Sequence, residues 1–328
     1  MSILVIVRND EENIRATLPH LLTMEGVDYE VVAVDDFSQD STLSVLGLFK
    51  QRYEKLKITS LSQETRYSEK LSQNIALKLA QNEWVLIYPA CAPNSSQSWL
   101  DQMCSVANEQ ALVKVSYTTI AYQKSWYNKL YRIENFFQQI RSASYIMNGA
   151  AFLYNEENVA FKKSEYFSRG GFGASVSEPY ANLELVLNRF IKKKNTELSL
   201  GKESSIVKNV SVGWHEIDEL LRKSIRIEKK LKKWKQFVLA VDRLMEVVYP
   251  FIAAIALLMV VGLWPLILAL VVLKELAYVV IIKILQNRLN ERKLFITSLV
   301  FSLVMPYYKF IHRWHFNRKG RNKWKNKG

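Results

Sequence analysis

The chain has 328 residues, of which 49% are hydrophobic and 23% charged, and its formal net charge is +14. So much apolar side chain excludes a disordered protein, and the presence of only two cysteines, Cys91 and Cys104, excludes a disulfide-stabilised scaffold. The positive charge is concentrated in two segments, 222–235 and 309–328, which bracket the strongly apolar residues 247–308. Basic residues beside an apolar segment are typical of a membrane protein, so we expect a membrane as a partner and no nucleic acid.

Short apolar runs alternate with segments of helical periodicity over residues 2–88. The predicted strands are 2–7, 29–34, 56–61 and 84–88, and the predicted helices are 11–24, 41–53 and 69–81. Alternation of this kind indicates an α/β protein with a mostly parallel, doubly wound sheet. Such sheets bind ligands beyond the carboxyl ends of their strands, so we expect the chemistry near 8–12, 35–40 and 89–94. Farther along, the pattern predicts a long helix at 127–145 and another at 180–193.

The apolar segment 247–273 exceeds the roughly 20 residues that a membrane-spanning helix needs. Gly262 and Pro265 are typical of the end of one helix and the first turn of the next. We therefore favour a hairpin with one helix at about 242–261 and a second at 265–285.

The alternative is a single span over 249–273, from which residues 294–308 return across the membrane. In the hairpin interpretation, residues 294–308 lie in the interface or re-enter the membrane, so the number of spans stays open. Both interpretations place the N-terminal domain and the basic tail on the cytoplasmic side, because basic residues prefer that side.

Two adjacent carboxylates, Asp35 and Asp36, end the second predicted strand, and a Ser/Asp/Thr-rich helix start follows them. One carboxylate can accept a hydrogen bond from a nucleoside base, and the other can accept one from the ribose hydroxyls. The alternative interpretation is structural, since Asp40 or Ser41 at the N-cap of the next helix would produce a similar pattern.

Residues 3–14 and 30–42 resemble the opening of family 2 glycosyltransferases, and residues 158–164 and 170–172 are similar to the acceptor-side loop of that family. The apolar and basic C-terminal part is similar to that of its membrane-bound bacterial members. The resemblance implies a GT-A fold followed by transmembrane helices, with a nucleotide sugar, most simply a UDP-sugar, as donor. By the same resemblance, the residues that bind the nucleotide are Arg8, Asn9, Glu11, Asp35 and Asp36.

The resemblance also implies an Asp-x-Asp motif that holds Mg²⁺ or Mn²⁺ against the diphosphate. In this chain the motif falls on Pro89, Ala90 and Cys91, and no carboxylate lies between Glu83 and Asp101. Hard cations prefer oxygen ligands, whereas Cys91 is a soft ligand and Pro89 offers no side-chain ligand. We therefore expect a degenerate motif that lacks the metal ligands of the family.

Two further positions of the family depart from its pattern. The general base falls on Asn182, which cannot take a proton; Glu178 and Glu184 are the nearest carboxylates, and Glu178 is a weak substitute. The Gln-x-x-Arg motif falls on Lys223 and Arg226, to which the resemblance assigns the diphosphate. In the alternative interpretation, these two residues simply belong to the basic run that faces lipid headgroups.

Two functional hypotheses follow from these residues. The first is a membrane-anchored, inverting glycosyltransferase that transfers a sugar from a nucleotide sugar to a lipid-linked or cell-surface glycan acceptor. The second is a catalytically inactive relative that binds a nucleotide, a glycan or a partner enzyme at the membrane, because loss of a general base alone costs roughly 10²- to 10⁴-fold in rate.

The expected organisation combines these segments in chain order. It comprises a GT-A domain at 1–220, a basic amphipathic segment at 221–246, a membrane region at 247–308 and a basic cytoplasmic tail at 309–328. The expected location is the bacterial inner membrane, crossed more than once, with the GT-A domain in the cytoplasm.

Overall fold

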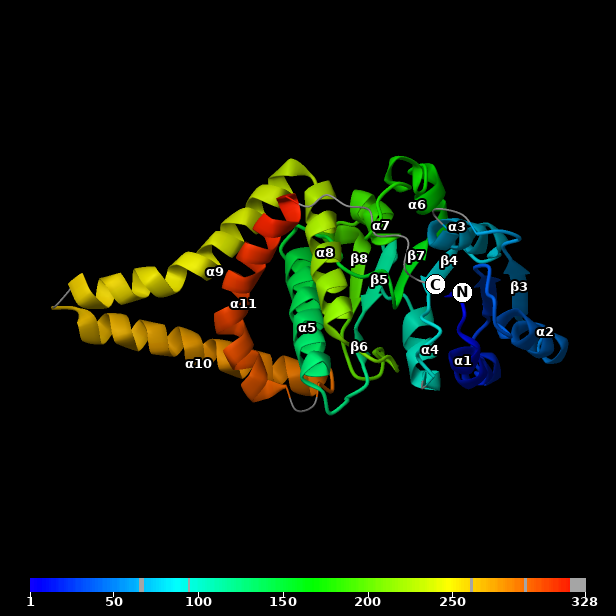
Figure 1. Ribbon diagram of the computed structural model, residues 1–328, viewed down its shortest axis with the longest axis horizontal. Coiled ribbons are helices and arrows are strands. Elements are labelled where there is room, and N and C mark those ends of the chain that lie inside the picture. The colour runs from blue at the N-terminus through cyan, green and yellow to red at the C-terminus, as the bar shows by residue number, and fades with distance from the viewer. Residues whose placement is uncertain (65–67, 94, 260–261, 292–293, 319–328) are drawn as a thin grey trace. The chain divides into compact units, whose positions relative to one another are not determined.

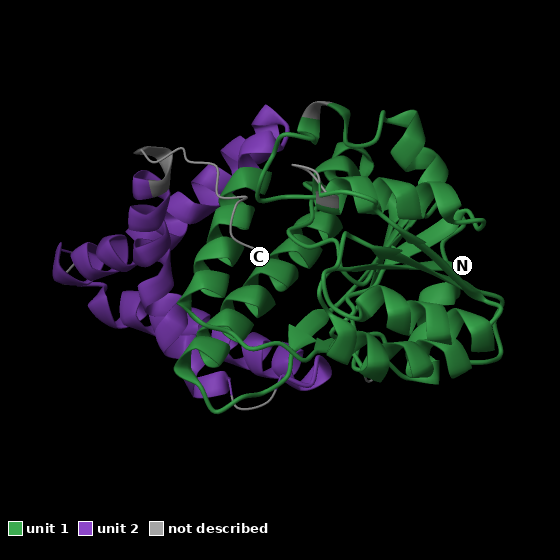
Figure 2. Ribbon diagram, turned by 45° about the vertical axis from the view of Figure 1, so that its right-hand side comes forward, with its two compact units in different colours: residues 1–227, 322–328 green, residues 228–321 purple. Residues whose placement is uncertain are grey.

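The computed structural model describes residues 1–64, 68–93, 95–259, 262–291 and 294–318 (Figure 1). The chain divides into two compact units, residues 1–227 and 228–321, which Figure 2 shows in different colours. Unit 1 is an α/β structure, and the described part of unit 2 is helical. Residues 319–328 of the predicted basic tail lie outside the described residues.

A seven-stranded mixed sheet with the strand order β3-β2-β1-β4-β7-β5-β8 organises unit 1. Its strands are β1 (Ser2–Val7), β2 (Glu30–Asp35), β3 (Leu56–Ser60), β4 (Trp84–Ile87), β5 (Val113–Ser116), β7 (Val159–Lys162) and β8 (Thr196–Ser199). The first four strands are parallel to one another, as predicted, and β7 runs antiparallel between β4 and β5. A second, two-stranded sheet pairs β6 (Thr118–Ile120) with β9 (Ile206–Lys208).

Helices cover both faces of the large sheet. The helices of unit 1 are α1 (Glu11–Thr23), α2 (Thr42–Arg52), α3 (Ser68–Leu79), α4 (Gln97–Cys104), α5 (Trp126–Met147), α6 (Lys163–Ser168), α7 (Glu184–Phe190) and α8 (Trp214–Lys230), the last of which continues into unit 2. Successive strand residues point to opposite faces. In β1, Ile3 therefore joins the core formed with α1, α2 and α4, while Leu4 joins the core formed with α3 and α7.

The predicted helix at 180–193 is correct only in its centre, because α7 spans Glu184–Phe190. Its N-terminal part is not helical, since the backbone N–H of Leu183 donates to the buried carboxylate of Glu156 at 2.6 Å. At the other end, Ile191 adopts an extended conformation with ψ of 130°. The segment before α7 is therefore a loop that a side chain from elsewhere in the chain holds in place.

Unit 2 consists of α9 (Lys233–Met259), α10 (Trp264–Arg288) and α11 (Phe295–Arg318), together with the end of α8. The break between α9 and α10 agrees with the predicted hairpin, although α9 begins earlier than the predicted helix. A continuous helix over 249–273 is wrong, because α9 ends at Met259 and α10 begins with a proline in its first turn.

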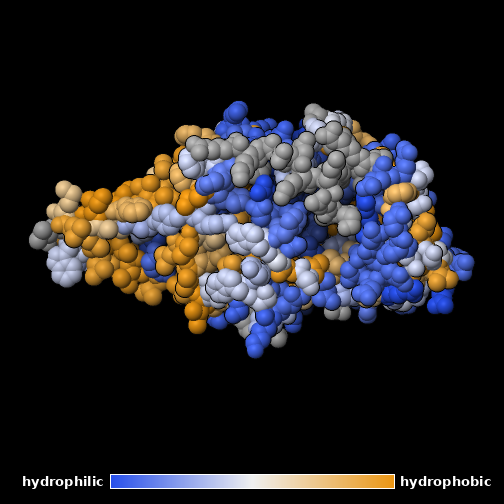
Figure 3. All heavy atoms as spheres, viewed as in Figure 1, coloured by the Kyte–Doolittle hydropathy of each residue, from blue (hydrophilic) through white to orange (hydrophobic). Residues whose placement is uncertain are grey.

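Two of the described helices, α10 and the 295–315 part of α11, are long and apolar enough to cross a membrane by length and composition. Residues 294–308 thus belong mostly to a regular helix. Only 6% of the most apolar window of α10 is buried, so its apolar side chains face outward. Hydrophobic residues accordingly dominate the surface of α9 and α10 in the space-filling view (Figure 3).

Two groups of charged residues inside unit 2 are paired. Lys274 and Glu275, which the hairpin interpretation places within the second span, form an ion pair at 2.6 Å, and the Lys274 ammonium lies 3.8 Å from the centre of the Tyr249 ring. Glu228 Oε2 accepts hydrogen bonds from Arg243 at 2.5 Å and Arg313 at 2.6 Å. The second arrangement joins α8, α9 and α11 through one carboxylate.

Candidate active site

The loops that follow β1 and β2 are tied together at the carboxyl ends of their strands. Asn9, in the left-handed region with φ of 49°, accepts a hydrogen bond from the backbone of Gln39 at 2.7 Å. Its own N–H donates to the hydroxyl of Ser38 at 2.9 Å. The first loop is further fixed by a bond from the N–H of Asp10 to the hydroxyl of Thr42 at 2.9 Å. The two segments that the sequence assigned to the nucleotide are therefore neighbours in space.

Asp35 and Asp36 lie at this edge and are 2% and 4% exposed. Asp35 Oδ2 accepts a hydrogen bond from the N–H of Ser38 at 3.2 Å, whereas Asp35 Oδ1 is buried with no hydrogen-bond partner among the described residues. A buried carboxylate oxygen without a donor is costly, so this atom is suited to accept an N–H or O–H from a ligand.

The capping interpretation of this motif is correct only in that Asp40, which precedes the N-cap residue, accepts a hydrogen bond from the first residue of α2. Asp40 Oδ1 accepts from the N–H of Thr42 at 3.0 Å, but the N-cap residue of α2, Ser41, makes no side-chain capping bond. The hydrogen bond to Asp40 does not account for the buried carboxylate of Asp35, because Asp35 Oδ1 takes no part in the start of α2.

The remaining two predicted nucleotide residues are engaged elsewhere. Arg8, after β1, forms an ion pair with Glu64 at 2.8 Å, and its side chain is 25% exposed. Glu11 accepts two hydrogen bonds from Arg15, one turn along α1, at 3.0 and 2.8 Å. One oxygen of the Glu11 carboxylate, Oε1, is thus engaged within its own helix.

The degenerate metal motif follows β4 and is held by backbone contacts. The carbonyl of Ala90 accepts from the hydroxyl of Thr17 at 2.5 Å, and the carbonyl of Cys91 accepts from the N–H of Asn209 at 2.6 Å. Burial raises the pKa of the Cys91 thiol to about 11, so the thiol is protonated at neutral pH and a poor ligand. Within the described ranges, no group of three or more His, Cys, Asp or Glu residues could hold a metal ion. These residues do not fit the divalent metal of the family.

A lysine that the sequence analysis did not single out lies beside Cys91. Lys208, the last residue of β9, pairs with both carboxylate oxygens of Glu157, at 2.8 and 3.0 Å. Burial lowers the pKa of Lys208, but the charge of Glu157 outweighs burial and raises it above its usual value, so the ammonium is charged. Burial also raises the pKa of the neighbouring Tyr131. The family resemblance did not extend to any of these three residues.

A second charged group contacts Asn182, the residue on which the resemblance places the general base. The backbone N–H of Asn182 donates to Glu184 Oε1 at 3.0 Å, and its side-chain amide donates to Glu156 Oε1 at 3.5 Å. Glu184 is fully buried, and the Lys223 ammonium lies 3.2 Å from its Oε1. The base position therefore contacts two carboxyl groups, of which Glu156 went unnoticed in the sequence.

The two carboxyl groups differ in protonation. Burial and the nearby Glu156 carboxylate raise the pKa of Glu184 well above its usual value. Burial also opposes ionisation of Glu156, but Lys223 and the hydrogen bond from Glu184 lower the pKa of Glu156. Glu156 therefore carries the negative charge, and Glu184 carries the proton that the pair shares.

Glu178 and Arg226, the other residues predicted near Asn182, are also paired. Glu178 is 7% exposed, and its Oε1 lies 3.7 Å from Nε of Arg226. The guanidinium of Arg226 also lies over the ring of Tyr180, 5.9 Å from its centre. Lys223 and Arg226 thus point to carboxylates of unit 1 and differ from freely solvated members of a basic run.

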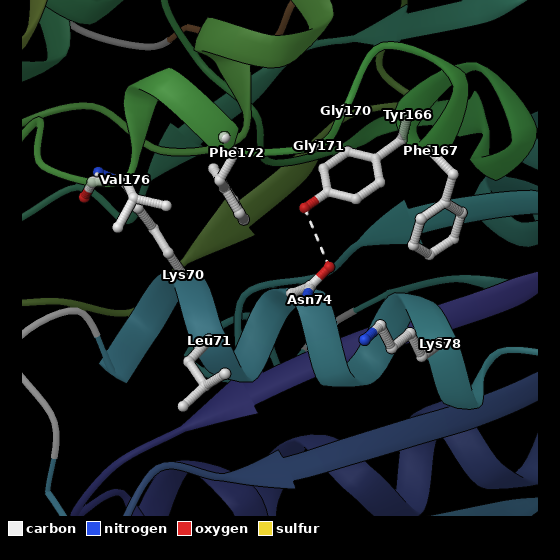
Figure 4. A pocket seen from close by; sticks show the side chains of 11 residues that line it. Lys70, Leu71, Asn74, Lys78, Tyr166, Phe167, Gly170, Gly171, Phe172 and Val176 are labelled. Atoms are coloured by element: carbon white, nitrogen blue, oxygen red, sulfur yellow. Dashed lines mark hydrogen bonds between the residues drawn. The ribbon is translucent and has the colours of Figure 1, made fainter.

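A pocket of about 420 Å³ lies between α3 and the loop that contains Gly170, Gly171 and Phe172 (Figure 4). The remaining lining residues are Lys70, Leu71, Asn74 and Lys78 of α3, Tyr166 and Phe167 of α6, and Gly173 and Val176. The hydroxyl of Tyr166 donates to Asn74 across the pocket at 3.2 Å. The loop that resembles the acceptor side of the family is thus folded against α3.

Residues 2–152 match the model of the family described as Glycosyl transferase family 2. This part of the chain belongs to that family. A poly(ribitol-phosphate) beta-glucosyltransferase of Bacillus spizizenii is 34% identical over 88 residues, which are 26% of this chain and 14% of that protein. A beta-monoglucosyldiacylglycerol synthase of Trichormus variabilis is 31% identical over 102 residues, 30% of this chain and 22% of that protein. The chain thus matches less than a quarter of the length of these curated relatives.

Solved structures confirm the GT-A fold of this glycosyltransferase domain. The mannosyltransferase PcManGT from Pyrobaculum calidifontis, in complex with GDP-Man and Mn²⁺, has a TM-score of 0.53 and 17% identity over 93% of this chain and 87% of its own. Residues 1–349 of S. aureus TarS, in complex with UDP-GlcNAc, have a TM-score of 0.50 and 15% identity over 70% of this chain and 65% of the other. At these identities the likeness concerns the fold alone.

Proposed function

We propose that the chain is a membrane-anchored glycosyltransferase that transfers a sugar from a UDP-sugar to a lipid-linked or cell-surface glycan acceptor. The observation that carries the proposal is the buried, unpartnered oxygen of Asp35 at the carboxyl end of β2. In a parallel sheet this is where a ligand binds, and a uracil N–H would satisfy that oxygen.

The relatives support the choice of substrates. One is named for glucosyl transfer to poly(ribitol-phosphate) and the other for synthesis of a glucosylated diacylglycerol, so glucose as the sugar and a polymer or glycolipid as the acceptor are consistent with both. The outward apolar faces of α10 and α11 would hold the enzyme at the membrane where such acceptors reside. In this proposal the enzyme crosses the bacterial inner membrane more than once, with unit 1 in the cytoplasm.

An inverting transfer needs a group that takes the proton of the acceptor hydroxyl. Asn182 cannot do so, but the Glu156–Glu184 pair contacts it and already shares one proton. In the proposal, this pair receives the acceptor proton, and Lys223 holds the charge of the pair within the fold.

The test is calorimetric binding of UDP to the detergent-solubilised full chain, first with EDTA and then with Mn²⁺. Asp35→Asn should weaken binding by roughly 10- to 100-fold, because hydrogen bonds to a charged group are worth about 1.5–3 kcal/mol. Asp101→Asn, on the exposed surface of α4, is the matched control and should bind as the wild type does. Absence of UDP binding by the wild type, or equal binding by Asp35→Asn, would refute the proposal.

A second candidate function is favoured by Asn182 and by the missing carboxylates at 89–91, namely an inactive relative that binds a nucleotide sugar without transferring it. Transfer of labelled glucose from UDP-glucose to a bacterial lipid extract distinguishes the two. Labelled product supports the transferase, whereas UDP binding without any product supports the inactive relative.

A further inference from the structure

The site contains a cation at the place where the family motif has lost its carboxylates. The backbone fixes that position, because the N–H of Asn209 donates to the carbonyl of Cys91, the last residue of the degenerate motif, at 2.6 Å. Lys208 immediately precedes Asn209, and its own carbonyl accepts from the N–H of Ala121 at 2.8 Å, next to the pairing of β9 with β6. The end of β9 therefore lies against the residues that follow β4.

The side chain of Lys208 is directed to the same edge of the sheet. Its ammonium pairs with Glu157, whose neighbour Asn158 donates its N–H to the carbonyl of Ile87, the last residue of β4, at 3.1 Å. The Lys208 side chain is 15% exposed and the Glu157 side chain 24%, so a ligand can reach the pair. An ammonium has three N–H donors, and Glu157 is its only hydrogen-bond partner among the described residues.

We propose that Lys208 binds the diphosphate of the donor and stabilises the leaving group at the place where the resemblance implies a metal ion. The inference rests on the proposed function, since it assumes a nucleotide-sugar donor. A divalent cation on two aspartates adds no net charge, and neither does Lys208 on Glu157. The site thus keeps its charge balance while a lysine N–H replaces the metal as the group that contacts the phosphate.

The role follows from the charge that develops in the reaction. The oxygen of the acceptor hydroxyl bonds to the anomeric carbon while the bond from that carbon to the diphosphate oxygen breaks. The electron pair of the broken bond leaves with the diphosphate, and the proton of the hydroxyl passes to the Glu156–Glu184 pair. Lys208 donates an N–H to the diphosphate oxygens as their negative charge increases, which is where a fixed positive charge is most effective.

The test compares binding of UDP with binding of uridine, by calorimetry on the detergent-solubilised full chain in EDTA. Lys208→Met should weaken UDP binding by roughly 10- to 100-fold and change uridine binding by less than about 2-fold, because uridine has no phosphate. Lys208→Arg should retain most of the UDP affinity, since it keeps the charge. Lys202 is an exposed lysine between β8 and β9. Lys202→Met is therefore the matched control, and it should bind UDP and uridine as the wild type does.

Lys208→Met leaves the Glu157 carboxylate without its cation, and this variant could unfold for that reason. A second variant keeps the test decisive in that case. Lys208→Met with Glu157→Gln removes both charges and should show the same selective loss of UDP binding. Equal UDP affinity in this double variant and in the wild type would overturn the proposal, and so would equal loss of UDP and uridine. UDP binding that Mn²⁺ strengthens more than about 10-fold in the wild type would also overturn it. Failure of the wild type to bind either ligand would instead refute the proposed function.

Discussion

Lys223, Glu156 and Glu184 form a buried charged group. We predict that two substitutions in this group differ sharply in their effect on stability. Lys223→Met removes the cation and leaves a buried, ionised Glu156 with its proton-sharing partner. Glu184→Gln keeps the shape of a side chain that already carries a proton. We expect Lys223→Met to destabilise the protein strongly and Glu184→Gln to destabilise it only slightly.

The magnitudes follow from the exposure of the two partners. Removal of one partner of a buried ion pair costs about 3–5 kcal/mol, and Lys223 is 24% exposed while the ionised Glu156 is 5% exposed, so we expect about 3 kcal/mol for Lys223→Met. In a domain of this size about 1 kcal/mol corresponds to a change in Tm of roughly 2–4 °C. Lys223→Met should therefore lower Tm by about 6–12 °C, and Glu184→Gln by less than about 4 °C.

The pH dependence of stability provides an independent check. The pKa of Glu184 is raised, so above its ordinary value of 4.5 the folded protein retains a proton that the unfolded chain has lost. Stability from this group is present below 4.5 and is lost as the pH rises through the folded pKa, with a slope of up to about 1.4 kcal/mol per pH unit. Glu184→Gln removes this contribution, so its Tm should depend less on pH above 4.5 than that of the wild type.

The assay is thermal unfolding of the detergent-solubilised full chain, followed by tryptophan fluorescence at several pH values. Lys193→Met, an exposed lysine near β8, is the control and should change Tm by less than about 2 °C. Equal losses of Tm for Lys223→Met and Glu184→Gln, or an unchanged pH profile for Glu184→Gln, would show that Glu184 is ionised in the folded protein. Either result would refute the reasoning.

Two further predictions concern other parts of the chain. Gly171→Ala should lower the stability by about 2–4 kcal/mol, measured by thermal unfolding, because Gly171 has φ of +51° and a Cβ there would lie 2.8 Å from the hydroxyl oxygen of Tyr166. Glu228→Gln should cost about 1–3 kcal/mol, and should make the junction of α8 and α9 more sensitive to protease, because Arg243 and Arg313 then lose their shared carboxylate while remaining partly solvated.

Matched variants isolate these two effects. Gly170→Ala shares the positive φ of its neighbour, at +74°, but its Cβ would meet no atom within 4 Å, so it should cost only the backbone strain. An equal loss for both glycine variants would show that the crowded tyrosine hydroxyl plays no part. Glu219→Gln, on the exposed face of α8, should leave Tm nearly unchanged. If it lowers Tm as much as Glu228→Gln does, the shared carboxylate is not the cause.

Much of the fold followed from local patterns in the sequence. The first four strands were predicted to within about one residue at each end, because buried parallel strands are short apolar runs with polar residues at their ends. The break between α9 and α10 was predicted from Gly262 and Pro265, since a proline is well suited to the first turn of a helix. The adjacent carboxylates Asp35 and Asp36 were found for the same reason, as they directly follow an apolar run.

The charged groups of the site, in contrast, were decided by tertiary structure. Glu157 and Lys208 are 51 residues apart and neither belongs to a periodic pattern, so only the tertiary fold, which places the end of β9 against the residues that follow β4, brings them together. Glu156 reaches Asn182 in the same way, and its bond to Leu183 also holds the loop before α7, where periodicity had predicted a helix. The residue types of the degenerate motifs can be read directly from the sequence. The charged side chains that lie next to those motifs are brought there by long-range contacts, and local spacing does not predict such contacts.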